Sequence, residues 1–169
     1  MENFSTISPL KLNGNAFEMI GKEWMLITGG TKNSFNTMTA SWGGFGELWF
    51  KPVVFIFIRP QRHTLEFINN NDFFTLSFFG KEKREELTFC GRNSGKDVDK
   101  FAHCDFLPFE TENKAIGIQE ATTILECKKL YVDTIKENCF INTDDLKHYP
   151  NKDFHLMYVA EVKNVYVRQ

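Results

Sequence analysis

The sequence predicts a mainly β fold with helices, an antiparallel β-barrel whose helices pack outside it or between its strands. Segments rich in β-branched and aromatic residues outnumber the segments of helical character. The two kinds of segment do not alternate regularly, which argues against a doubly wound parallel sheet. No repeat, low-complexity stretch or proline-rich linker interrupts the 169 residues, so residues 1–169 are expected to form a single domain.

Strands are expected over residues 24–28, 35–42, 53–59, 73–79, 121–135 (as one or two strands) and 154–168. Glycine pairs at Gly29-Gly30 and Gly43-Gly44 are expected to end the first two. Residues 53–58 are apolar at every position, so this strand is expected to be buried on both faces. Pro60 ends it, because proline has no N–H to donate to a neighbouring strand.

Three short helices are expected. The first covers residues 64–70 with Thr64 as its N-cap, and the second covers 81–90 with Lys81 and Glu85 paired four residues apart. The third runs to residue 103 and opens with a capping box of Ser94 and Asp97.

Composition excludes several classes of protein. The net charge of −2 and the pI of about 6.1 argue against nucleic-acid binding by charge alone. The N-terminus resembles no signal peptide, and the longest strictly apolar run, residues 53–58, is too short to span a membrane. The four cysteines lack metal-ligand spacing, so we expect reduced thiols, no metal site and a cytoplasmic protein.

Phenylalanine is unusually frequent, with 18 residues, of which most lie between Phe35 and Phe109. These rings are either a dense aromatic core or, in part, the wall of a site for a planar ligand. Phe55 and Phe57, on the apolar strand, are assigned to the core. Phe45, Phe79 and Phe101 lie beside the segments described next and are assigned to a pocket.

The first segment with possible chemistry combines small, hydroxylated and aromatic residues along a predicted strand. It consists of Asn36, Thr37, Met38, Thr39, Ala40, Ser41 and Trp42. Small side chains would let a flat ligand lie against the backbone, whose N–H groups could bond its carbonyls. The alternative is an ordinary strand with a Thr/Ser face.

Two further segments carry positive charge. Arg59 and Arg62 flank a proline turn that leads to Thr64 and a helix start, an arrangement suited to a phosphate group. Alternatively, the arginines are solvated or pair with a carboxylate. Residues 94–101 place Lys100 beside Phe101, where the lysine could reach an anion or belong to a solvated helix face.

Taken in order, the patterns N-x-M-T-A-S-W, R-P-x-R-x-T and S-G-x-D-x-D-K-F resemble the flavin reductase-like proteins, and the flavoredoxin branch most of all. The resemblance covers residues 24–168. A fourth segment, 153–162, is similar to the family pattern G-D-H-x-x-x-x-G-E-V, with His155 at the histidine. It departs from that pattern at Asp153, Phe154 and Ala160, and a buried histidine at a strand start is the alternative role for His155.

The resemblance implies an FMN-binding split barrel and a role for each matching residue. Thr39, Ala40, Ser41 and Trp42 would contact the isoalloxazine edge and ribityl chain, and Asn36, Thr37 and Met38 would line the same strand. Arg59, Arg62 and Thr64 would hold the FMN phosphate, and Ser94, Lys100 and Phe101 would close the site. His155 would lie near the nicotinamide and the flavin, and the protein would be a homodimer with the flavin near its interface.

The function expected is that of an FMN-binding oxidoreductase, namely an NAD(P)H:flavin oxidoreductase. It would pass electrons from NAD(P)H through the flavin to free flavin or a partner protein. Lys100 would stabilise negative charge on the reduced ring. The alternatives are a flavoredoxin-like electron carrier without a nicotinamide site, or a non-catalytic module that binds flavin or haem. No nucleic-acid or membrane partner is expected.

Overall fold

Residues 3–169 are described by a computed structural model, in which eight strands form one sheet. The strands are β1 (Phe4–Ile7), β2 (Met25–Thr31), β3 (Ser34–Ala40), β4 (Gly43–Leu48), β5 (Lys51–Ile58), β6 (Phe73–Phe78), β9 (Thr123–Thr134) and β10 (Leu156–Arg168). Their order is β3-β2-β6-β9-β10-β5-β4, with β1 beside β10, and every pairing is antiparallel. A separate hairpin joins β7 (Pro108–Glu110) to β8 (Ile116–Ile118).

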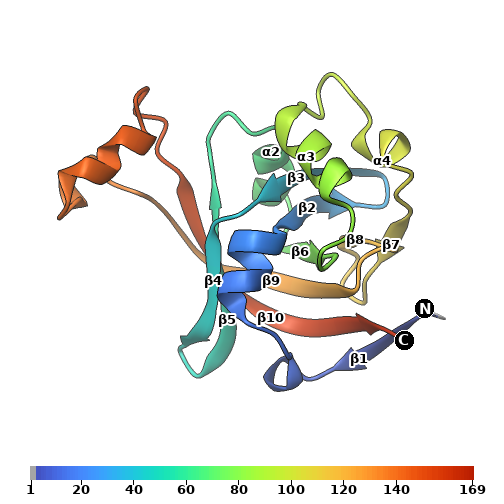
Figure 1. Ribbon diagram of the computed structural model, residues 1–169. Coiled ribbons are helices and arrows are strands. Elements are labelled where there is room, and N and C mark those ends of the chain that lie inside the picture. The colour runs from blue at the N-terminus through green and yellow to red at the C-terminus, as the bar shows by residue number, and fades with distance from the viewer. Residues whose placement is uncertain (1–2) are drawn as a thin grey trace.

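The sheet curves into an open barrel (Figure 1). β3 and β4 end the strand order and follow each other in sequence through Ser41 and Trp42, but they do not pair in the described chain. The prediction of an antiparallel barrel is therefore confirmed. The free edge of β3 is also one border of the site described below.

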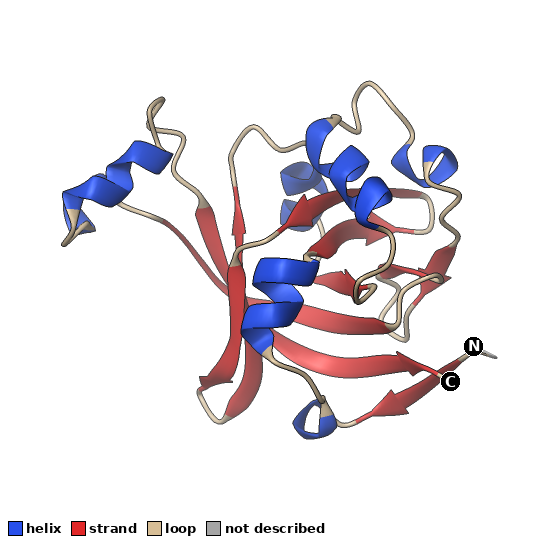
Figure 2. Cartoon of the chain, viewed as in Figure 1, coloured by secondary structure: helices blue, strands red, loops and turns tan. Residues whose placement is uncertain are grey.

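The helices lie outside the strands (Figure 2). They are η1 (Pro9–Lys11), α1 (Ala16–Glu18), η2 (Met19–Glu23), α2 (Thr64–Asn69), α3 (Arg84–Arg92), α4 (Lys100–His103), η3 (Glu137–Cys139) and η4 (Thr143–His148). The last two belong to residues 135–155, which project from the barrel as an arm between β9 and β10 (Figure 1). Within residues 3–169, no helix is both long and apolar enough to cross a bilayer.

Two apolar clusters meet at the sheet. The barrel interior includes Met25, Ile56 and Leu76, whereas Leu26 and Leu87 belong to a second cluster between the sheet and the helices α3 and α4. These side chains are at most 1% exposed. Because each fully buried side chain of this size contributes about 1.5–3 kcal/mol, the two clusters fix the orientation of β3 and α3 around the site.

The strand predictions at 73–79 and 154–168 are confirmed by β6 and β10, and the predicted segment 121–135 contains one long strand, β9 (Thr123–Thr134), in place of two. Gly29-Gly30 does not end β2, which continues to Thr31. A Cβ on Gly29 would lie 2.8 Å from the Ile68 Cδ1 atom, so this glycine serves the close approach of α2 instead of a turn. Gly43-Gly44 likewise begins β4.

The assignments of the phenylalanines need correction. Phe55 and Phe57 are half-buried while Val54, Ile56 and Ile58 face the core, so β5 is not buried equally on both faces. Phe79 is 2% exposed inside the second apolar cluster, and Phe45 packs against the barrel interior. Neither of these two rings lines the site.

The first two helix predictions shift at their starts. Thr64 is the first residue of α2, which His63 precedes, so Thr64 is not its N-cap. α3 begins at Arg84 because Lys83 has a left-handed backbone, with φ of 60°. Lys81 therefore lies outside the helix, and the ion pair of this region joins Lys83 Nζ to Glu86 Oε1 at 3.0 Å.

The third helix prediction is too long. Only Lys100–His103 is helical, and its N-cap is Asp99, whose carboxylate accepts a hydrogen bond from the Ala102 N–H at 3.0 Å. Ser94 instead closes a turn by accepting from the Lys96 N–H at 3.2 Å. Residues 94–98 therefore form a turn, and its Gly95 packs against Asn36 on β3.

Candidate functional site

A cleft runs from the end of β3 to the start of α2 and consists of two adjoining cavities of about 230 and 190 Å³. Both cavities are lined by Met38, Arg59 and Arg62. The structure brings most of the predicted binding residues to this cleft: Asn36, Met38, Thr39, Ala40, Ser41, Trp42, Arg59, Arg62, Thr64, Ser94, Lys100 and His155.

Thr37 and Phe101 do not line this cleft. The Thr37 side chain points into the protein, where its hydroxyl donates to the Ile27 carbonyl at 3.2 Å and accepts from the Thr28 hydroxyl. The ring of Phe101 is 8% exposed, packs edge-on against Phe35 and borders a neighbouring cavity of about 460 Å³. Successive side chains of a strand point to opposite faces, so Thr37 faces away from the side of β3 that Met38 presents to the cleft.

Three contacts join the walls of the cleft. The Asn36 Nδ2 amide on β3 donates to the Thr64 hydroxyl on α2 at 2.8 Å. Gly95 lets the 94–99 loop lie on the Asn36 side chain, because a Cβ there would approach the Asn36 Oδ1 atom to 2.0 Å. Lys100 Nζ donates to the carbonyls of Thr37 and Cys90, each at 2.8 Å. β3, α2 and the end of α3 are thereby held in one arrangement.

Sequence reasoning missed several residues of the cleft. Phe57 from β5 and Arg92 from the last turn of α3 also line it. Phe57 stood in an all-apolar run, and the outward side of that run is visible only once the register of β5 is known. Arg92 belongs to none of the motifs, so no signal in the sequence identified it.

Positive charge gathers where the two cavities meet. Arg59 forms an ion pair with Asp153, and its Nη2 donates to the His148 carbonyl at 2.8 Å. Arg62 donates to the Gly91 carbonyl at 2.7 Å and has no carboxylate partner among residues 3–169. Lys100 is 5% exposed and bonds only to carbonyl groups.

The electrostatics of these cations favour an anion. Burial lowers the pKa of Arg62, and the neighbouring charge of Arg59 lowers it further. Burial also lowers the pKa of Lys100, and repulsion by Arg62 contributes to that lowering. The charged forms of Arg62 and Lys100 are therefore less stable here than in water. The negative charge of a bound phosphate would stabilise both charged forms.

His155 lies directly before β10, is 7% exposed and lines the cleft. Its Nδ1 atom is 2.9 Å from the Tyr149 hydroxyl, and its ring centre is 5.1 Å from that of Trp42. Burial lowers the pKa of His155 to about 4, with a further contribution from Arg59. The imidazole is therefore neutral at pH 7. It is both a buried, hydrogen-bonded histidine and a residue of the site.

The lowered pKa of His155 implies a pH dependence of stability. The folded value of about 4 lies below the ordinary 6.5, so the unfolded chain takes up a proton that the folded chain does not as the pH falls between these values. This group is expected to reduce the free energy of unfolding by at most about 1.4 kcal/mol per pH unit in that window. Urea unfolding of a His155→Gln variant from pH 7 to pH 4.5 is expected to show a shallower slope than the wild type. The exposed residue His103 provides the control variant His103→Gln, and equal slopes for both variants would contradict the assignment.

Solved structures with similar folds include flavoredoxin from Methanosarcina acetivorans, with a TM-score of 0.68 and 24% identity over 94% of this chain and 75% of that one. A protein from Shewanella frigidimarina described with a flavin reductase split barrel domain matches with a TM-score of 0.68 and 16% identity, over 95% and 77% of the two chains. The NADH:FAD oxidoreductase of Streptomyces globisporus matches with a TM-score of 0.64 and 18% identity, over 87% and 75%. These likenesses establish the split-barrel fold.

No curated protein sequence shows significant similarity to the chain. The chain does match the flavin reductase like domain family over residues 19–169, which includes every residue of the cleft. The protein is a member of the flavin reductase-like family.

Proposed function

We propose that the protein is an FMN-binding oxidoreductase that takes electrons from NAD(P)H and passes them to free flavin or to a partner protein. The observation that carries this proposal is the cluster of Arg59, Arg62 and Lys100 in a cleft that is bordered by the free edge of β3. Family membership and the fold are consistent with it.

The residues of the cleft suit FMN. Arg62 has no carboxylate partner in the described chain and could bind the phosphate together with Arg59, Thr64 and Ser94. The small side chains of Ala40 and Ser41 leave room for a flat ring against β3. β3 is an edge strand, so part of its backbone is free to bond the polar edge of that ring.

When bound, the flavin would supply the electron-transfer chemistry, and the protein would supply binding and orientation. The Tyr149 hydroxyl can donate to His155 Nδ1, which places the proton of the neutral imidazole on Nε2. From there it could donate into the cleft beside Trp42. Lys100 holds β3 to α3 through its two carbonyl contacts, so we assign it a positioning role.

The departures from the family pattern around His155 are compatible with a nicotinamide site. Asp153 forms the ion pair with Arg59, and Ala160 is fully buried within β10. Neither residue obstructs the cleft. We therefore favour the reductase over an electron carrier that lacks a nicotinamide site.

We also propose that the protein is a homodimer in the cytoplasm. Trp49 and Phe50, at the turn between β4 and β5, are 57% and 99% exposed, an unusual exposure for two adjacent aromatic residues. The Sγ atoms of Cys90 and Cys104 lie 3.9 Å apart, and a reducing compartment would keep both residues as thiols. Light scattering of the purified protein tests the dimer.

The visible spectrum of the purified protein tests the proposed function. We expect flavin absorbance as isolated or after addition of FMN, and its loss when NADH or NADPH is added without oxygen. Bound FMN that neither nucleotide reduces would support the carrier, and a haem spectrum would support the binding module. A colourless protein that shows no FMN binding by fluorescence titration would refute all flavin-based functions.

A further inference from the structure

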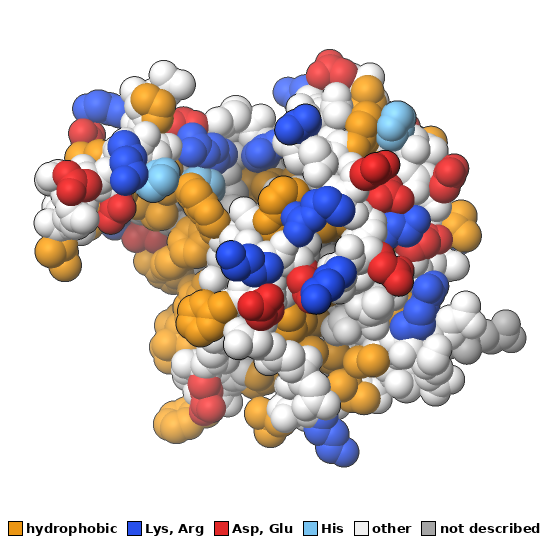
Figure 3. Space-filling view, in the orientation of Figure 1, with side chains coloured by type: hydrophobic (Ala, Val, Ile, Leu, Met, Phe, Trp, Pro, Cys, Tyr) orange, Lys and Arg blue, Asp and Glu red, His pale blue; other side chains and the backbone are white. Residues whose placement is uncertain are grey.

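A larger cavity of about 740 Å³ lies between the arm and the barrel, and we call it the arm cavity. Its wall runs from Asp133 at the end of β9 to Tyr149 at the end of η4, and it also includes Trp42. The space-filling view shows the molecule hollowed between the arm and the barrel, with hydrophobic side chains at the hollow (Figure 3). Trp42 also lines the cleft, so the two spaces meet at this ring.

The wall of the arm cavity is mainly apolar and aromatic. Trp42, Ile135, Phe140, Ile141 and Tyr149 line it. Trp42 is 45% exposed, and Ile141 is fully exposed. An uncharged aromatic molecule would cover this surface, and ligand sites of this size are commonly lined in this way.

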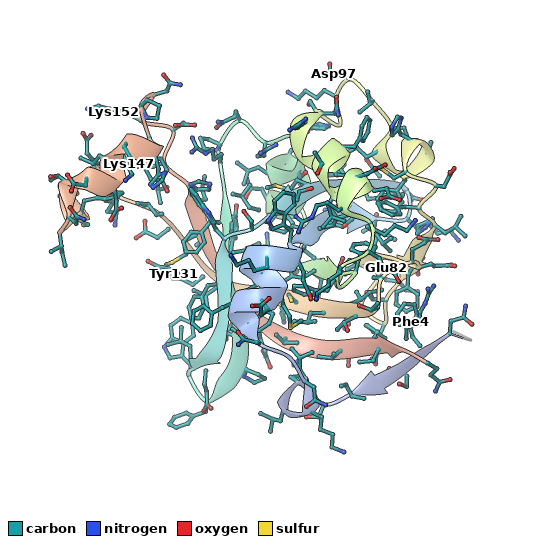
Figure 4. The ribbon with its side chains drawn as sticks, in the orientation of Figure 1. Phe4, Glu82, Asp97, Tyr131, Lys147 and Lys152 are labelled. Atoms are coloured by element: carbon teal, nitrogen blue, oxygen red, sulfur yellow. The ribbon has the colours of Figure 1, made fainter. Side chains whose placement is uncertain are left out.

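The arm cavity has no surplus of positive charge. Its one lysine, Lys136, donates to the Asp133 carboxylate at 2.8 Å, and Asp145 adds a second negative charge. Lys147 and Lys152 lie on the arm but do not line the cavity (Figure 4). A phosphate group would therefore meet net negative charge here, in contrast to the cleft with its clustered arginines.

We propose that the arm cavity binds an uncharged, planar electron acceptor of the quinone class. The proposal rests on the proposed function, because the electrons would come from the flavin site on the other side of Trp42. The overall reaction is NAD(P)H + H⁺ + quinone → NAD(P)⁺ + hydroquinone. The nicotinamide loses two electrons and a proton as hydride, and the quinone gains two electrons and two protons, the second proton coming from solvent.

The position of Trp42 supports an acceptor in the arm cavity next to the flavin site in the cleft. Its ring borders both spaces and stands 5.1 Å from the His155 ring and 5.8 Å from the His148 ring, measured between ring centres. A flat acceptor stacked in the arm cavity would lie next to the part of the cleft assigned to the isoalloxazine. Neutral quinone oxygens need only hydrogen-bond donors, which Lys136 can supply with the protons not given to Asp133.

The test uses duroquinone, whose fully substituted ring cannot alkylate the Cys139 thiol that also lines the cavity. Its affinity is measured by calorimetry for the protein with and without FMN. The variant Ile141→Asp removes an exposed apolar wall and adds negative charge, and we expect it to weaken duroquinone binding at least tenfold without changing FMN affinity. Phe17→Asp, at a residue of α1 that is 88% exposed and outside the cavity, is the matched control and is expected to bind like the wild type.

Each outcome decides between alternatives. Duroquinone binding that is lost in Ile141→Asp and kept in Phe17→Asp supports the proposal. Absent binding, or binding that neither variant changes, overturns it. Nicotinamide mononucleotide that competes with duroquinone would also overturn it, because the cavity would then accept a phosphate. If FMN fails to bind, the proposed function fails, whereas calorimetry on the flavin-free protein still reports on the arm cavity.

Discussion

Replacing Arg62 with alanine is expected to weaken FMN binding by about 10- to 150-fold, since hydrogen bonds to charged groups contribute about 1.5–3 kcal/mol. Of the two arginines that line both cavities of the cleft, Arg62 is the one without a carboxylate partner in the described chain. Its one hydrogen bond goes to the Gly91 carbonyl, and its pKa is lowered by burial and, to a smaller extent, by repulsion from Arg59. Arg59, in contrast, already has Asp153 as a partner. The unpaired guanidinium is therefore expected to provide most of the attraction for the phosphate.

Riboflavin, which lacks the phosphate, gives the sharpest control. The Arg62→Ala variant is expected to bind riboflavin as the wild type does, so the difference in affinity between FMN and riboflavin should collapse. Arg84→Ala provides a matched arginine, because Arg84 stacks on Trp24 at 3.8 Å and lies outside the cleft. Fluorescence titration of both ligands measures all three proteins. An equal loss of both ligands in Arg62→Ala would contradict a phosphate role.

Local sequence patterns predicted most strands, because β-branched and aromatic composition is a local property. They failed at Gly29, where the controlling contact is with Ile68 on α2. They also failed at β5, where alternation of exposure depends on which strands lie on either side. The role of Gly29 and the exposure of each face of β5 depend on contacts with segments distant in the sequence. The local sequence of a single segment does not determine these contacts.

The site was predicted as a set of residues but not as an arrangement. The motifs identified Arg59 and Lys100, yet the partner of Arg59 is Asp153, from the arm. Lys100 was assigned to the ligand, whereas its ammonium bonds the carbonyls of Thr37 and Cys90. The residue types correctly indicated positive charge. Only the tertiary structure shows that Arg59 is paired with a carboxylate and that Arg62 is not.

Glu126 belongs to a buried network that no pattern in the sequence indicated. It lies on β9 with no exposed surface, and its carboxylate accepts from the Asn113 N–H at 2.8 Å and from the Asn164 amide at 2.7 Å. The hydroxyls of Thr111 and Tyr166 also donate to it. Burial raises the pKa of Tyr166 to about 12, so its hydroxyl stays a donor at neutral pH. The network thus ties the loop between β7 and β8 to β9 and β10.

Replacing Glu126 with leucine is therefore expected to lower the free energy of unfolding by about 3 kcal/mol, because at least two hydrogen bonds to a charged acceptor are lost. For a chain of this length, that corresponds to a fall in Tm of about 6–12 °C. Glu126→Gln keeps the shape but turns one acceptor into a donor that faces other donors, so a smaller loss is expected. Glu112→Gln is the matched control, since Glu112 is exposed and its carboxylate contacts the network only at the Asn164 amide, while its backbone N–H still donates to the Tyr166 hydroxyl in the variant. None of the network residues lines the cleft, so FMN affinity should stay within about twofold in all three variants. Equal stability of Glu126→Leu and Glu112→Gln in urea unfolding would show that the network does not hold the hairpin in place.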